Sequence, residues 1–152
     1  MRGNSKPAAF PKISVRNIQR AITVNTVDLK KFAGMAVGCC LALHQRKGTD
    51  LTRLREIFIW IISDRRMTCL HRQFLNKAGS TDVLTFEHGE IFISAETARQ
   101  NARVFGNSLT HEIRLYVVHG LLHLHGFDDR TKARAREMEK VQQRIFRELT
   151  GW

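Results

Sequence analysis

The chain has 152 residues, a length that suits one compact domain with its own buried core. Apolar residues make up 43% and charged residues 26%, a balance that excludes an intrinsically disordered chain. Lysine and arginine number 25 against 14 aspartate and glutamate residues, so the net charge is +11. This excess favours a phosphate-rich ligand such as nucleic acid, with better solubility as the plainer explanation.

The sequence also limits where the protein is expected to act. No run approaches the roughly 18 consecutive apolar residues of a membrane helix, and the first residues lack the apolar segment of a secretory signal. The chain has 3 cysteines and no Cys-x-x-Cys pair, which favours a reducing compartment. We therefore expect a cytoplasmic protein with no membrane partner.

The predicted elements alternate between strands and helices. Both prolines fall within residues 1–11, which we expect to form an N-terminal tail ahead of a single domain over residues 12–152. Apolar runs predict strands over Ile13–Val15, Glu56–Ile62, Asp82–Phe86 and Glu90–Ser94. Helical spacing and caps predict helices over Asp28–Gln45 (capped near Thr26 or Asp28, closed by Gly48 and Asp50), Arg65–Leu75 after Ser63-Asp64, Ser94–Phe105, Ser108–His125 and Thr131–Leu149.

These elements predict an α+β fold of the α/β type. We expect a small mixed sheet of about four strands, packed with four or five helices. The helix over Ser108–His125 is apolar on nearly every side, so it is expected to be buried.

Two histidines on this helix give the clearest functional signal. His119 and His123 are four residues apart, a spacing that places both side chains on one helix face. Two imidazoles in this relation can bind one transition-metal ion. In a buried helix without a metal, each would need its own hydrogen-bond partner. The pattern favours a metal site, with buried core histidines as the alternative.

A third ligand is expected from the turn after the helix. Gly126 can take the left-handed conformation that ends a helix, so the chain can double back and bring Asp128 or Asp129 towards the imidazoles. His125 competes, but it points about 200° away from His123 while the helix lasts. Three ligands and an open fourth position are typical of catalytic zinc, whereas structural zinc usually has four ligands.

The segment from His119 to Asp129 resembles the signature of the YbeY family, the metal-dependent endoribonucleases of bacterial small-subunit ribosomal RNA maturation. The family motif reads His-Gly-x-Leu-His-Leu-x-Gly-Tyr-Asp-His, and here Phe127 replaces the tyrosine and Asp129 the last histidine. A second family segment, Thr-Asp-Val-Leu-Ser-Phe, is similar to residues 81–86. It is followed by Gly-Glu-Ile at residues 89–91, where the family has Gly-Asp-Ile or Gly-Asp-Val. The resemblance extends over roughly residues 50–150.

The resemblance implies one zinc ion per chain, bound by His119, His123 and Asp129. Asp129 stands where the family has its third metal-binding histidine. A carboxylate is an ordinary zinc ligand. Its negative charge is expected to leave the bound water, the expected nucleophile, less acidic than in a site of three histidines.

Two further positions depart from the family. Leu75 stands where the family places an arginine in its substrate cleft, and a cation there would stabilise charge at the scissile phosphate. Arg72 and Lys77 are the candidates to replace it, with solvated surface as the alternative for Arg72. Ser80 replaces a proline, and we expect this to change only the stiffness of the loop.

The expected function is that of a zinc-dependent, single-strand-specific endoribonuclease in small-subunit ribosomal RNA 3′-end maturation and ribosome quality control. The resemblance implies ribosomal RNA and the small ribosomal subunit as partners, together with ribosomal-protein or GTPase partners. The candidate RNA-binding residues are Arg65, Arg66, Arg72 and Lys77. No residue is assigned as the general base.

Two other functions remain open at the level of sequence. A non-catalytic, ribosome-associated RNA-binding protein would have an equally basic surface. A zinc metalloprotease would have two histidines at the same spacing, but Gly120 occupies the position of the glutamate that serves such proteases as general base.

Overall fold

The computed structural model describes residues 10–43 and 51–151. Within these ranges the elements are β1 (Lys12–Asn17), α1 (Thr26–Leu41), β2 (Glu56–Ile62), α2 (Asp64–Leu75), β3 (Val83–Phe86), β4 (Glu90–Ser94), α3 (Ala95–Phe105), α4 (Leu109–Leu124) and α5 (Lys132–Thr150). They confirm the predicted α+β class. None of the helices in this part of the chain has both the length and the apolar character needed to cross a bilayer.

The strands form one mixed sheet in the order β1-β2-β4-β3. β1 and β4 both run parallel to β2, whereas β3 is antiparallel to β4 and forms an edge. The central strand β2 buries Ile57, Ile59 and Ile61 completely, which fits the apolar run seen in the sequence. The edge strand β3 borders a surface cavity.

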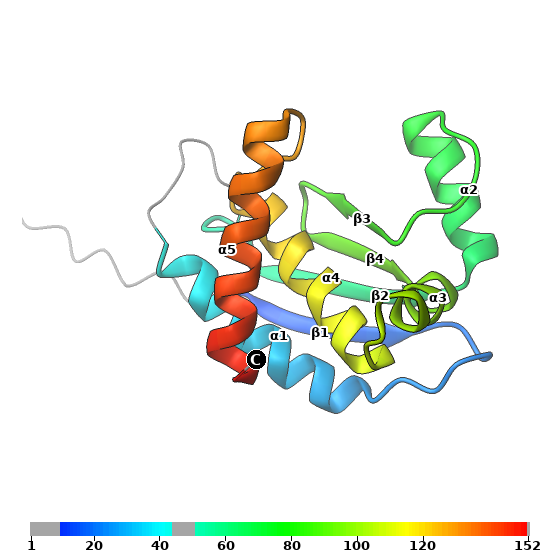
Figure 1. Ribbon diagram of the computed structural model, residues 1–152, viewed down its shortest axis with the longest axis horizontal. Helices are drawn as coiled ribbons and strands as arrows, with labels where there is room; N and C mark the ends of the chain where they lie inside the picture. Colours follow the sequence, from blue (N-terminus) through cyan, green and yellow to red (C-terminus); the bar gives the residue numbers. More distant parts are fainter. Residues whose placement is uncertain (1–9, 44–50, 152) are drawn as a thin grey trace, which may run out of the picture.

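Helices α1, α4 and α5 cover one face of the sheet, and α2 and α3 lie towards one end of the strands (Figure 1). α1 packs on β1 and α4 on β3 and β4, while α5 lies over α1 and α4. Its side chains Val117, Val118, Leu121 and Leu122 are buried, which confirms the predicted burial of this helix.

A glycine lets α4 approach the sheet closely. A Cβ atom added at Gly120 would lie 2.9 Å from both Cδ1 and Cγ2 of Ile91 on β4, closer than side-chain atoms normally come. Position 120 therefore faces the sheet. His119 and His123 are turned instead towards the cavity beside β3.

The first helix differs from its prediction at both ends. Its N-cap is Asn25, whose Oδ1 accepts a hydrogen bond from the backbone N–H of Asp28 at 3.1 Å. The helix ends at Leu41. The backbone N–H of Leu43 donates to the carbonyl of Cys40, three residues earlier, instead of to the residue four positions earlier as in an α-helix. The predicted end at Gln45 is therefore wrong, and the predicted closing residues Gly48 and Asp50 lie outside the described residues.

The remaining element boundaries agree with the prediction to within two residues. Local capping explains why, since four helices follow a hydroxyl side chain that accepts a backbone N–H bond three residues later. These caps are Ser63, Ser94, Ser108 and Thr131. The predicted tail over residues 1–11 lies almost entirely outside the described part of the chain.

Candidate metal centre

The last two turns of α4 position the two histidines. His119 and His123 are both half-buried and lie one helical turn apart, with ring centroids 4.7 Å from each other. The surrounding helix is held in the core, so both rings are placed by a rigid element.

A glycine turn then reverses the chain. Gly126 has φ of 93° and donates its backbone N–H to His123 O at 3.1 Å, while the N–H of Phe127 donates to Leu122 O at 3.0 Å. This pair of bonds is the Schellman arrangement that closes a helix. Phe127 is buried and anchors the returning chain. The turn predicted at Gly126 is thereby confirmed.

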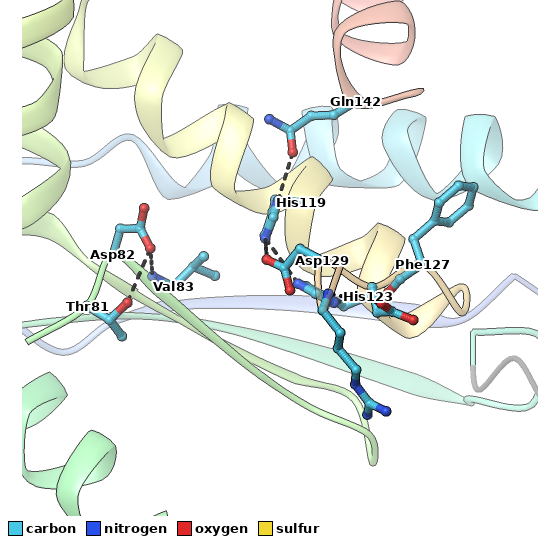
Figure 2. A network of polar contacts seen from close by, with 10 residues as sticks. Thr81, Asp82, Val83, His119, His123, Phe127, Asp129 and Gln142 are labelled. Atoms are coloured by element: carbon cyan, nitrogen blue, oxygen red, sulfur yellow. Dashed lines mark hydrogen bonds and ion pairs between the residues drawn. The ribbon is translucent and has the colours of Figure 1, made fainter. Parts of the chain in front are cut away.

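The returning chain places a third donor beside the imidazoles. Nε2 of His119 lies 3.1 Å from Nε2 of His123 and 4.0 Å from Oδ2 of Asp129. The donor atoms of these residues all lie within 4.8 Å of one another (Figure 2). Ligand atoms about 2.0–2.1 Å from a tetrahedral zinc ion would be separated by about 3.3 Å. The donor set therefore fits a zinc ion with little movement of the side chains.

Hydrogen bonds at the far sides of the rings define how the imidazoles face each other. Nδ1 of His123 donates to the carbonyl oxygen of Phe127 at 3.1 Å, and Nδ1 of His119 to Oε1 of Gln142 on α5 at 2.9 Å (Figure 2). Each Nε2 atom then carries a lone pair. Two lone pairs 3.1 Å apart repel each other unless a cation lies between them, so this arrangement suits a metal ion.

The electrostatics of the site keep His123 neutral. Burial lowers the pKa of His123 below its usual 6.5, and the neighbouring His119 lowers it further, while Asp129 acts in the opposite direction. A neutral imidazole is the form that binds a metal ion. His123 is therefore in the protonation state that a metal ion requires.

The donor atoms lie in a cavity of about 640 Å³. One wall is β3 with its flanking residues, and the other is the end of α4 with the turn that follows. On the β3 wall, Oδ1 of Asp82 accepts the backbone N–H of Val83 at 2.8 Å and the hydroxyl of Thr81 at 3.4 Å (Figure 2). The segment at residues 81–85 therefore forms the wall opposite the candidate metal donors.

Two other histidines lie outside the donor set. His125 is fully buried, and its ring stacks at 6.4 Å on that of Phe127. His111 contacts Phe146 at 4.6 Å and lines a different cavity. Neither belongs to the donor set.

The predicted RNA-binding cations do not line the metal cavity. Arg65, Arg66, Arg72 and Lys77 are exposed on α2 and the loop after it. Leu75 is 47% exposed and is also absent from the cavity wall.

Sequence reasoning missed two residues of the site, Gln142 and Arg130. Gln142 lies 23 residues from its partner His119, so no local pattern could reveal the contact. Arg130 lines the cavity, and its place directly after Asp129 was a signal available in the sequence.

Comparison with known proteins agrees with these features. The family model described as endoribonuclease YbeY matches residues 14–150. The chain is 36% identical over 115 residues to an endoribonuclease YbeY of Gluconobacter oxydans, covering 72% of this chain and 68% of the relative. It is 39% identical over 99 residues to that of Nautilia profundicola, covering 58% and 71%.

A solved structure shows the same architecture. The solution structure of TM1509 from Thermotoga maritima matches 91% of this chain and 89% of its own, with a TM-score of 0.64 and 25% sequence identity. The family match, which spans nearly the whole chain, and the close relatives lead to one conclusion. This chain belongs to the endoribonuclease YbeY family.

Proposed function

We propose that the protein is a zinc-dependent endoribonuclease specific for single-stranded RNA, with one zinc ion per chain. Family membership supports cleavage of RNA, and the observation that carries the metal is the convergence of His119, His123 and Asp129 on one open cavity. Three protein donors with room for a fourth ligand are typical of catalytic rather than structural zinc.

The residues around that site would have two roles: some would bind the metal, and others orient the metal-binding side chains. His119 and His123 would hold the metal through Nε2, and Asp129 through a carboxylate oxygen. Gln142 and the carbonyl of Phe127 fix the orientation of the two rings. A bound zinc ion would supply a Lewis acid for a phosphoryl oxygen and lower the pKa of a water molecule.

The biological setting is proposed from the family. We place the cleavage in the 3′-end maturation of small-subunit ribosomal RNA and in ribosome quality control, in the cytoplasm. Partners would be the small ribosomal subunit and a ribosomal protein or GTPase. The exposed cations of α2 and its following loop, Arg65, Arg66, Arg72 and Lys77, would bind RNA outside the cavity.

A metalloprotease is disfavoured by the packing of α4. The position that carries the general-base glutamate in such proteases is Gly120 here, and its missing side chain would point into Ile91 on the sheet. A longer side chain there would collide with the core instead of reaching the cavity.

The test combines metal analysis with cleavage assays on His123→Ala and wild type. Wild type should contain zinc and cleave a single-stranded RNA, and the variant should lose both. His88→Ala is the matched control, since His88 is exposed and paired with Glu90 at 2.7 Å. Tight RNA binding by wild type without cleavage would favour a binding protein, and cleavage of casein but not RNA a protease.

A further inference from the structure

The metal cavity is an unfavourable place for RNA in one respect. Among the described residues that line it, four carry carboxylates and one carries a positive charge. The acids are Asp82, Glu87, Asp128 and Asp129, and the cation is Arg130. Even with a divalent metal bound, a phosphodiester entering this cavity would meet several carboxylates, so a cation on the cavity wall is needed to favour its approach.

Hydrogen bonds within the turn fix the backbone that carries Arg130. The backbone N–H of Arg130 donates to Oδ1 of Asp128 at 3.1 Å, and Oδ2 of the same carboxylate pairs with Nη1 of Arg134 at 3.3 Å. Asp128 therefore contacts both arginines and holds the turn in place.

The Arg130 side chain itself is available. It is exposed and forms no ion pair with the part of the chain that the structure describes. It directly follows Asp129 in the chain and lines the same cavity as the candidate metal donors. A planar guanidinium can offer two parallel N–H donors to a phosphate.

No other cation takes this place in the described residues. Leu75, Arg72 and Lys77, on α2 and the loop after it, do not line the cavity. The chain therefore carries its cavity cation on the turn after α4 and not on α2.

We propose that Arg130 binds a phosphate group of the RNA strand inside the metal cavity. The proposal rests on the proposed ribonuclease function and assigns the phosphate contact of that site. Because the guanidinium approaches from the same turn as Asp129, the phosphate it holds would be the scissile one or its direct neighbour.

The experiment compares Arg130→Gln, Arg130→Lys and wild type on a short fluorescein-labelled single-stranded RNA. Arg136→Gln is the matched control, since Arg136 is an exposed cation on α5 that does not line the cavity. Two readouts are taken: kcat/KM for cleavage by the zinc-loaded proteins, and anisotropy of RNA binding by the metal-free proteins over a range of salt concentrations. Zinc content is measured for every variant.

Arg130→Gln should keep its zinc and lose about 10- to 100-fold in kcat/KM, the effect expected for one charge-assisted hydrogen-bond contact. Its RNA affinity should fall. The slope of log affinity against log salt concentration should become less negative by about 0.7, the change expected when one phosphate contact is lost. Arg130→Lys should recover part of both losses, and Arg136→Gln should stay near wild type.

Equal losses in Arg130→Gln and Arg136→Gln would overturn the assignment, because they would reflect overall charge alone. A wild type that binds RNA but does not cleave it would contradict the proposed ribonuclease, while the binding comparison would still decide the role of Arg130. A wild type that neither binds nor cleaves RNA would overturn both proposals.

Discussion

At the scale of single residues, the candidate metal donors are oriented by neighbours outside the donor set. The clearest case is Gln142, whose Oε1 accepts the Nδ1–H of His119 at 2.9 Å. This bond keeps the lone pair of His119 on Nε2 and holds the ring towards His123. Gln142→Ala should therefore weaken zinc binding about 10- to 100-fold, the usual effect of removing such a supporting bond.

Competition with a chromophoric zinc chelator at pH 7.5 measures this change directly. Gln143→Ala is the control, since Gln143 is the next residue on α5, half-buried like Gln142, and does not line the metal cavity. If both variants keep the zinc affinity of wild type, Gln142 does not position His119.

At the scale of elements, the site depends on how closely α4 lies on β4. Gly120→Ala puts a methyl group 2.9 Å from atoms of Ile91, and we expect a net loss of about 1 kcal/mol or more in unfolding free energy, because overpacking outweighs the better helix propensity of alanine. On α1, a Cβ at Gly34 would meet nothing within 4 Å, so Gly34→Ala should gain about 0.5–1 kcal/mol. Urea denaturation of both variants gives the comparison, and a stabilised Gly120→Ala would contradict the close packing.

At the scale of the whole molecule, the sequence predicted what is locally encoded. Hydroxyl caps such as Ser63 and Ser108, and the glycine turn at Gly126, placed most helix ends within a few residues. The histidine spacing predicted that His119 and His123 share one face, and the turn predicted an aspartate beside them, which in the structure is Asp129. The end of α1 was missed because no capping glycine marks it, and the last backbone hydrogen bond, from Leu43 to Cys40, spans three residues instead of four.

Contacts between segments that are distant in the sequence could not be predicted from local sequence patterns. The bond from His119 to Gln142 depends on how α5 packs on α4, and the cavity beside β3 depends on the strand order. Hydrophobic periodicity shows which face of an element is buried, but not which partner covers it. Resemblance to a family had to supply Asp129 rather than Asp128 as the third donor.

One such long-range contact joins several elements and predicts how the molecule responds to acid. Asp64, at the start of α2, accepts hydrogen bonds from the hydroxyls of Ser80 at 3.2 Å, Thr97 at 2.6 Å and Ser94. It thereby connects α2, the loop that leads to the cavity wall, and the junction of β4 with α3. Partial burial opposes ionisation, but these hydrogen bonds outweigh it and lower the pKa of Asp64 below 3.8.

Because the pKa of Asp64 is lower in the folded than in the unfolded chain, the unfolded chain binds the proton more readily. The carboxylate therefore contributes its full stabilisation above about pH 4 and loses it as the pH falls through the folded pKa. Asp64→Asn should be less stable than wild type at pH 7, and the difference should shrink towards pH 3. Urea unfolding across this range tests it, with the exposed Glu139→Gln as control. A difference between Asp64→Asn and wild type that stays constant from pH 7 to pH 3 would show that the carboxylate charge does not hold these elements together.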